Sequence, residues 1–272
     1  MAKRTVQEKV AVITGSSMGI GKATARLLAS QGAKVVINGR TESRLEQAKR
    51  EFEQVGFEVL AVTADISTQA GASLLITETI KHFGQIDILI NNAGMSARGY
   101  FEEIDPEVLE RMLQINVMGC LHPTKAALPY LESAQGSIVF VSSVAGIRGL
   151  PETGIYCATK MALTAMAESL KVELSDKVIH VGIIYVGITE NDPGKRVIDK
   201  DGSYLLLKDR KQRNTQKPED VAQAILRMIE KRQFKKILTF LGKLNAMANV
   251  LFPRLVDRVL IRSKEKIRRL NT

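Results

Sequence analysis

The chain has 272 residues, enough for one large α/β domain or two small ones, and its 45% hydrophobic and 25% charged content indicates a globular protein with a sizeable core. Its two cysteines, Cys120 and Cys157, lack the paired spacing of a disulfide framework or a structural zinc site. The apolar run near the N-terminus, residues 10–13, is too short for a secretory signal. We therefore expect a protein of a reducing compartment, the cytoplasm.

The formal net charge of +10 belongs to one end of the chain. Residues 231–272 contain 12 of the 39 Lys and Arg residues and 2 of the 29 Asp and Glu residues. The other 230 residues hold 27 basic and 27 acidic groups, which cancel. The basicity is a property of the C-terminal segment and not of the body.

Short apolar segments rich in Val, Ile and Leu alternate along the chain with longer amphipathic segments. The former are typical of buried strands and the latter of helices. Strands that alternate with helices form a parallel sheet covered on both faces. In chain order we predict strands over 9–14, 33–39, 57–65, 86–94, 136–143 and 178–187, and helices over 22–30, 40–56, 69–83, about 106–133 and about 154–175.

One segment, about 188–217, fits neither pattern and is too long for an ordinary connection. Segments of this length are commonly lids, binding loops or disordered chain. We predict a single domain over 1–230 that includes this segment as a substrate lid. A C-terminal extension, 231–272, would hold the last strand and a basic amphipathic tail.

A glycine-rich turn, TGSSMGIG (residues 14–21), lies directly between the first predicted strand and the first predicted helix. Glycines at such a turn let backbone N–H groups approach a pyrophosphate at the helix N-terminus. A glycine cluster alone is weak evidence, and the spacing here is GxxxGxG instead of GxGxxG. Its position between a strand and a helix, at the start of an alternating chain, predicts dinucleotide binding.

The end of the second predicted strand bears on which dinucleotide binds. A carboxylate there would accept hydrogen bonds from the adenosine ribose, whereas an arginine would accommodate a 2′-phosphate. The chain has Asn38, Gly39 and Arg40 at this place, and the next acid after the strand is Glu42. The sequence therefore favours NADP(H) over NAD(H). The alternative is that Arg40 only caps or solvates the following helix.

Six motifs follow one another in a fixed order: TGSSMGIG (14–21), Asp65 after the third strand, NNAG (91–94), Asn116 within INVMG, SSVAG (142–146) and YCATK (156–160). With these motifs the sequence resembles the short-chain dehydrogenase/reductase family over residues 7–230. The resemblance implies a Rossmann-like, doubly wound parallel sheet of about seven strands with helices on both faces. It also implies a nicotinamide cofactor and assembly as a homodimer or homotetramer.

The resemblance assigns catalytic roles to four residues. Tyr156 would be the general acid and base that protonates a carbonyl oxygen, and Lys160 would lower the pKa of that phenol and hold the nicotinamide ribose. Ser143 would hydrogen-bond the substrate oxygen, and Asn116 would shape its helix and position a water for proton relay. A free tyrosine has a pKa of about 10, so a neighbouring cation acts in the direction that the chemistry requires.

The resemblance also implies where the cofactor lies. Asp65 and Ile66 would flank the adenine, Asn92 and Gly94 would line the cofactor trough, and Arg40 would meet the 2′-phosphate. The implied cofactor-binding set is Gly15, Ser17, Met18, Gly19, Ile20, Gly21, Arg40, Asp65, Ile66, Asn92, Gly94, Tyr156, Lys160, Gly187 and Thr189.

The C-terminal extension departs from the family pattern. Apolar residues recur with a helical period at 237, 241, 244, 248, 251 and 255, and Pro253 could open a second short helix. Basic residues between them indicate a helix over 237–270 that lies on the cytoplasmic face of a membrane, with too many charges to span it. The alternative is that the apolar face packs on the body or on a partner subunit. One aromatic residue, Phe252, follows position 240, so nucleic-acid binding is not expected.

We therefore expect an NADP(H)-dependent oxidoreductase that interconverts a ketone and a secondary alcohol. The tail and the apolar run at 204–207 suggest a lipophilic substrate. No metal is expected, because the three histidines have no partner spacing for one. Val186-Gly187 stands where the family has Pro-Gly. Each site residue, taken alone, is also compatible with a purely structural role in the fold. Two alternatives remain for the whole chain: a catalytically silent dinucleotide sensor or scaffold, and a peripheral membrane protein that acts mainly through its tail.

Overall fold

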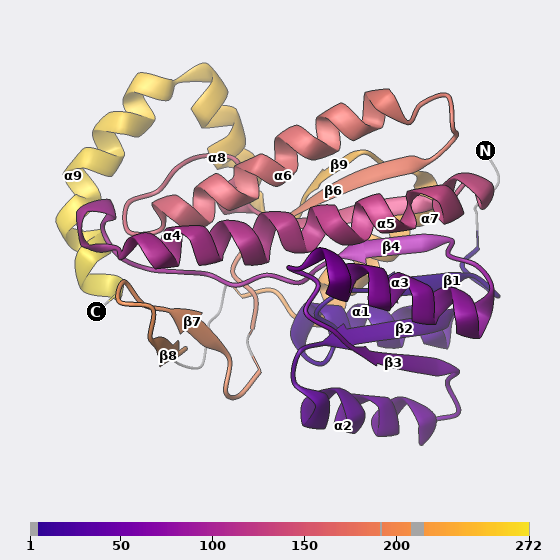
Figure 1. Ribbon diagram of the computed structural model, residues 1–272. Helices are drawn as coiled ribbons and strands as arrows, with labels where there is room; N and C mark the ends of the chain where they lie inside the picture. The colour runs from indigo at the N-terminus through magenta and orange to yellow at the C-terminus, as the bar shows by residue number, and fades with distance from the viewer. Residues whose placement is uncertain (1–4, 191, 208–214, 272) are drawn as a thin grey trace.

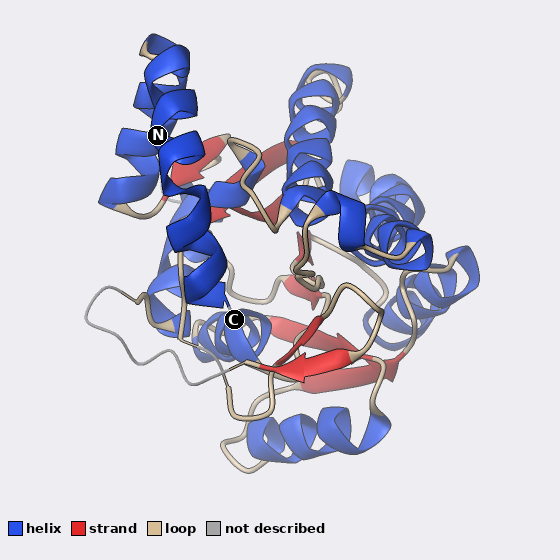
Figure 2. Cartoon of the chain, turned by 90° about the vertical axis from the view of Figure 1, so that its left-hand side faces the viewer, coloured by secondary structure: helices blue, strands red, loops and turns tan. Residues whose placement is uncertain are grey.

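The computed structural model describes residues 5–190, 192–207 and 215–271. Seven parallel strands form one sheet in the order β3-β2-β1-β4-β5-β6-β9, which confirms the predicted Rossmann-like, doubly wound architecture (Figure 1). Figure 2 shows the strands flanked by helices. The strands are β1 (Val10–Ile13), β2 (Lys34–Gly39), β3 (Val59–Thr63), β4 (Ile88–Asn91), β5 (Ser137–Ser143), β6 (His180–Val186) and β9 (Lys235–Ile237).

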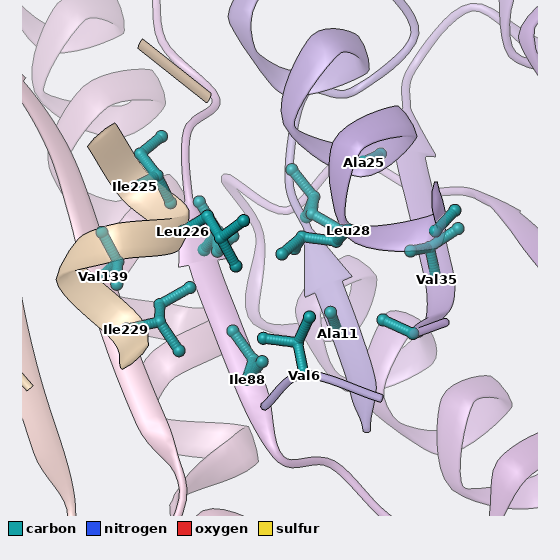
Figure 3. Close-up of a cluster of buried hydrophobic side chains, with 14 of the residues drawn as sticks. Val6, Ala11, Ala25, Leu28, Val35, Ile88, Val139, Ile225, Leu226 and Ile229 are labelled. Carbon is teal, nitrogen blue, oxygen red and sulfur yellow. The ribbon is translucent and has the colours of Figure 1, made fainter. Parts of the chain in front are cut away.

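Side chains that alternate along each strand build two separate cores, one on each face of the sheet. In β1, Ala11 and Ile13 face the first core, while Val10 and Val12 face the second. The first core, part of which Figure 3 shows, is covered by α1 (Gly19–Ser30), α2 (Glu42–Glu53) and α7 (Pro218–Lys231). The second core is covered by α3 (Gln69–Phe83), α5 (Gly119–Ser133) and α6 (Gly154–Glu173).

Most element boundaries agree with the prediction to within a few residues, but two helices differ from it. Helix α1 begins at Gly19, three residues before the predicted start. The helix predicted over 106–133 consists of α4 (Pro106–Leu113) and α5, joined by a π-helical turn over Gln114–Met118. A π turn is frequent at functional sites, and this one carries Asn116.

The segment predicted as a lid contains a two-stranded antiparallel hairpin, β7 (Arg196–Ile198) and β8 (Tyr204–Leu206), that the sequence did not predict. Ile198 is fully buried, and its backbone N–H donates to the Ser96 carbonyl while its carbonyl accepts from Arg98. The hairpin is therefore docked on the segment that follows β4. Residues 191 and 208–214 of the predicted lid lie outside the described residues.

The C-terminal extension begins with β9, which pairs with β6 in the main sheet, and continues as α8 (Phe240–Leu251) and α9 (Pro253–Asn271). Pro253 opens a second helix as predicted, although at 19 residues it is not short. Among the described residues, no helix is both long and apolar enough to cross a bilayer. The basic side chains predicted beyond position 263 lie outside the side chains that the structure describes.

Candidate active site

The glycine turn between β1 and α1 forms a floor on which side chains have no room. Gly15 and Gly19 have φ angles of +61° and +58°, in the left-handed region that favours glycine. A Cβ atom on Gly15 would lie 2.8 Å from the Ala93 Cα, and one on Gly21 would lie 2.5 Å from both the Asn92 Nδ2 and the Gly15 carbonyl oxygen. Side chains at Gly15 and Gly21 would therefore collide with the segment after β4 and with the turn itself, so these two positions require glycine.

The N-terminus of α1 opens onto this floor. Met18 is its N-cap, no side chain caps the helix, and its first turn contains no acidic residue. Ser17 and Ile20 are half-buried beside it. Positive dipole and free N–H groups at a helix N-terminus attract anions, so this geometry fits a pyrophosphate.

One carboxylate lies close to the turn. The Oδ2 atom of Asp192, from the segment after β6, is 3.5 Å from where a Cβ on Gly19 would stand. This oxygen is buried and has no hydrogen-bond partner among the described residues. The sequence analysis did not single out Asp192, since a lone acid in a long irregular segment gives no signal.

Asn38 fixes the neighbouring strand ends. It is buried, its Nδ2 donates to the carbonyls of Val62 and Ala64, and its backbone N–H donates to the Ser16 hydroxyl. These bonds tie the glycine turn to the ends of β2 and β3. This role of Asn38 was not predicted from the sequence.

Arg40 and Asp65, both exposed, follow the ends of these two adjacent strands. The Arg40 Nη2 lies 3.7 Å from the Met95 Sδ, so the guanidinium reaches across the edge of the sheet. The Asp65 Oδ1 accepts from the Ser67 N–H at 3.0 Å and from its hydroxyl at 2.7 Å. Ile66, the predicted neighbour of the adenine, is buried in the second core.

A third residue whose role was not predicted, Thr14, joins the glycine turn to the end of β4. Its hydroxyl oxygen accepts from the backbone N–H groups of Asn92 and Ala93, each at 3.0 Å. The Asn92 amide donates in return to the carbonyls of Thr14 and Gly15, at 2.9 and 3.0 Å. Four bonds thus hold Asn92 and Ala93 to the turn, and TG at the end of a first strand was the available signal.

Asn116 connects the segment after β4 to α6. It is fully buried, its Oδ1 accepts from the Met95 N–H at 2.7 Å, and its Nδ2 donates to the Met95 carbonyl and to the Thr159 hydroxyl. A Cβ on Gly94 would lie 3.1 Å from the Asn116 Oδ1 and 3.3 Å from the Lys160 Nζ. Asn116, Gly94 and Lys160 are therefore adjacent, although they are far apart in sequence.

Lys160 is a buried cation at the centre of the candidate site. Its side chain projects from α6, its Nζ donates to the Val141 carbonyl at 3.1 Å, and it lies 5.9 Å from the centroid of the Tyr156 ring. Among the described residues no carboxylate pairs with it. Burying an unpaired charge is costly, so a lysine in this position indicates a function for the charge.

Ser143 and Tyr156 complete this group at the carboxyl end of β5. Ser143 is the last residue of β5 and caps a short 3₁₀ turn, Val144–Gly146, with its Oγ accepting from the Ala145 N–H at 3.2 Å. Tyr156 is half-buried in the first turn of α6. Both lie at the edge of the sheet where the glycine turn and the Gly94 segment end.

The segment after β6 is fixed by a residue that the sequence analysis missed, Gln216. The Gly187 N–H donates to the Gln216 Oε1 at 3.0 Å, and Thr189 forms an isolated bridge with Gln216. The Thr189 hydroxyl donates to the Gly187 carbonyl at 3.3 Å. Gln216 therefore holds the chain that leads from β6 toward the site, where this sequence has Val186 in place of the family's proline.

A third apolar cluster, smaller than the two main cores, lies beside Tyr156. Tyr156 and Ile155 pack against it, and β7 supplies Ile198. Arg111 from α4 stacks 4.7 Å from the ring centroid of Tyr204, which holds the hairpin against α4. The buried members of the cluster are Ala97, Ile104, Val108, Met112 and Ile198.

Comparison with known proteins agrees with this geometry, because a family model described as short chain dehydrogenase matches residues 9–201. This chain belongs to the short-chain dehydrogenase/reductase (SDR) family. Rat dehydrogenase/reductase SDR family member 7B is 32% identical over 98% of this chain and 85% of its own length. A Staphylococcus epidermidis protein described as an uncharacterized oxidoreductase is 37% identical over 70% of this chain and 81% of its own.

Three solved structures share the fold. A Burkholderia phymatum member in complex with NAD is 24% identical, with a TM-score of 0.82 over 93% of this chain and 96% of its own. An alcohol dehydrogenase of Thermococcus sibiricus, complexed with 5-hydroxy-NADP, is 28% identical, with a TM-score of 0.73 over 85% and 95% of the two chains. A 3-ketoacyl-(acyl-carrier-protein) reductase of Brucella melitensis, complexed with NADH, is 27% identical, with a TM-score of 0.74 over 86% and 97%. The chain is thus an SDR oxidoreductase.

Proposed function

We propose that this SDR protein is an NADP(H)-dependent oxidoreductase that interconverts a ketone and a secondary alcohol. The observation that carries the proposal is the buried Lys160 cation beside the Tyr156 ring, at the edge where the glycine turn ends, with no carboxylate paired to it among the described residues. A pure dinucleotide binder has no need for a phenol and a serine hydroxyl next to such a cation.

The proton chemistry follows from these side chains. A bound nicotinamide dinucleotide would supply the hydride to the carbonyl carbon. Tyr156 donates its hydroxyl proton to the carbonyl oxygen, and Ser143 donates a hydrogen bond to the same oxygen. Lys160 stabilises the phenolate that remains. In the direction of alcohol oxidation, the phenolate takes the proton back.

The residues present fit a dinucleotide. Gly15 and Gly21 let the turn pack directly on the segment after β4, and the uncapped start of α1 would receive the pyrophosphate. Arg40 would meet a 2′-phosphate, and Asp65 with Ile66 would border the adenine. Asn92, Gly94, Gly187 and Thr189 would line the rest of the trough.

The preference for NADP(H) rests on charge at the end of β2. The exposed Arg40 guanidinium supplies a cation there, and residues 34–41 contain no carboxylate. Structural relatives were solved with NAD, NADH and an NADP derivative, so the choice must come from this chain's own residues.

The apolar cluster beside Tyr156 supports a small lipophilic carbonyl compound as the substrate. The catalytic unit would be residues 1–230, with 188–217 as its lid, working as a cytoplasmic homodimer or homotetramer. The C-terminal extension would then be free to bring this unit to a membrane face.

The test is NADPH consumption by the purified protein with a panel of hydrophobic ketones, repeated with NADH. We expect turnover with at least one ketone and a kcat/KM about tenfold or more higher for NADPH than for NADH. Tight NADPH binding without turnover on any carbonyl would instead identify a dinucleotide sensor. Equal kcat/KM values for NADPH and NADH would contradict the proposed contact between Arg40 and the 2′-phosphate.

A further inference from the structure

Helix α8 presents an apolar stripe to the outside of the molecule. Phe240, Leu244, Met247 and Leu251 recur at helical spacing, and their side chains are 78%, 45%, 55% and 58% exposed. The opposite side of the helix carries small and polar residues, and Gly242 is its one buried member. The helix is therefore turned with its apolar face away from the body.

Helix α9 adds cations beside further exposed apolar side chains. Leu255 and Val259 are 57% and 54% exposed. Arg254, Arg258 and Arg262 follow one another at intervals of four residues, all exposed, and so form one row next to these side chains. Among the described residues none of the three arginines pairs with a carboxylate.

Specific contacts hold α8 and α9 at the carboxyl edge of the sheet. Arg148, five residues after Ser143, donates to Asn249 of α8 and forms an ion pair with Asp257 of α9. A Cβ on Gly242 would lie 2.8 Å from Val144, the residue next to Ser143. Figure 1 shows α9 at the same end of the molecule as the β7–β8 hairpin, where Leu206 is 67% exposed.

We propose that the outer face of α8 and α9, defined by Phe240, Leu244, Met247, Leu251, Leu255, Val259, Arg254, Arg258 and Arg262, docks on an anionic lipid surface. An exposed apolar stripe with arginines along its side combines acyl-chain burial with attraction to lipid headgroups. The arginine stems can lie along the apolar boundary while their guanidinium groups stay in the headgroup layer.

Charge decides against the other occupants of this face. A second copy would bring two extensions together, each with 12 basic and 2 acidic residues, and like charges would oppose each other. Nucleic acid would match the charge but leave the apolar stripe in water. Because the extension lies beside Ser143, docking also turns the substrate side of the site toward the lipid.

The experiment is co-sedimentation of the full chain with vesicles of phosphatidylcholine alone and with phosphatidylserine added. We expect binding to the anionic vesicles only, weakening as salt is raised. The double variant Leu244→Glu, Met247→Glu and the triple variant Arg254→Gln, Arg258→Gln, Arg262→Gln should each bind about tenfold or more weakly. Retained NADPH binding by both variants would show that they are folded.

Matched controls separate this surface from general charge and apolarity. Val55→Glu places a charge on a side chain as exposed as Leu244 (48% against 45%), at the end of α2. The triple variant Lys49→Gln, Arg50→Gln, Lys81→Gln removes the same charge from α2 and α3. Both controls should bind like the wild type.

Equal pelleting of all variants would overturn the proposal. A second result would also overturn it: the wild type forms an oligomer, the Leu244→Glu, Met247→Glu variant is monomeric, and neither protein binds vesicles. A second copy of the chain would then cover this face.

Discussion

Helices α1 and α8 are both 12 residues long, yet they meet their surroundings in opposite ways. Five residues of α1 are buried, and its Leu28 is completely covered in the first core. One residue of α8 is buried, while its large apolar side chains face outward. Hydrophobic content alone therefore does not determine burial. In the body, the apolar side chains form the core that positions the site. In the C-terminal extension, the apolar side chains remain exposed and available to a partner.

The largest expected effect is a difference in unfolding free energy between a Leu→Ala substitution in α1 and one in α8. Leu28→Ala should lower the free energy of unfolding by about 2–5 kcal/mol, because it empties a fully buried site. Leu244→Ala should change it by less than about 0.5 kcal/mol, because the side chain is 45% exposed. Urea unfolding of the two variants measures both. Similar losses would mean that α8 is packed as tightly as α1.

The complete burial of Cys120 in the second core predicts a slowly reacting thiol. Burial raises the pKa of the Cys120 thiol to about 11, and the nearby Lys160 charge offsets only part of that rise. In a Cys157→Ser variant at pH 8, Cys120 should react with a thiol reagent about a hundredfold or more slower than in urea. A raised thiol pKa also costs stability as the pH climbs from about 9 to about 11, because only the unfolded chain then releases the proton. Rapid native labelling would contradict the closed core.

The close packing of the glycine floor gives an effect of intermediate size. Gly21→Ala should lower the free energy of unfolding by about 1–3 kcal/mol and weaken NADPH binding, because its Cβ would stand 2.5 Å from the Gly15 carbonyl oxygen. Gly154→Ala is the matched control, since nothing lies within 4 Å of its Cβ position at the start of α6. Thermal unfolding and NADPH titration of both variants test this. Unchanged stability and unchanged NADPH binding of Gly21→Ala would show that the turn can accommodate a Cβ atom at this position.

The smallest expected effect concerns Asp192, the carboxylate beside Gly19 at the start of α1. Asp192→Asn should lower the Kd for NADPH about two- to fivefold, because it removes a negative charge beside Gly19. Asp201→Asn, in the turn between β7 and β8, removes the same charge from an exposed site and should leave the Kd unchanged. Fluorescence titration measures both, and weaker binding by Asp192→Asn would mean that the carboxylate assists the cofactor.

The sheet could be predicted from the sequence because its strands are short apolar runs between amphipathic helices. The motifs that placed Ser143, Tyr156 and Lys160 lie at strand ends and in the first two turns of a helix, where local pattern and three-dimensional position agree. Their roles stay a prediction. Asn38 and Gln216 gave no such signal, because each acts through bonds to strands or loops more than twenty residues away.

The hairpin and the extension show what local pattern cannot supply. Strands β7 and β8 have three residues each, and Ile198 of β7 is stabilised by its bridge to Ala97, a tertiary contact. The helical period of the extension predicted α8 and α9. It could not predict that Gly242 faces the body and Leu244 the outside, because an amphipathic pattern does not say which partner covers its apolar side.

Tyr156→Phe tests the central claim most directly, with NADPH oxidation and NADPH binding measured in the same preparations. The variant keeps the ring beside Lys160 and removes only the hydroxyl. We expect kcat for ketone reduction to fall at least about a hundredfold while the Kd for NADPH stays within about twofold of the wild-type value. Undiminished turnover by Tyr156→Phe would contradict the assignment of Tyr156 as the proton donor, and with it the proposed reaction.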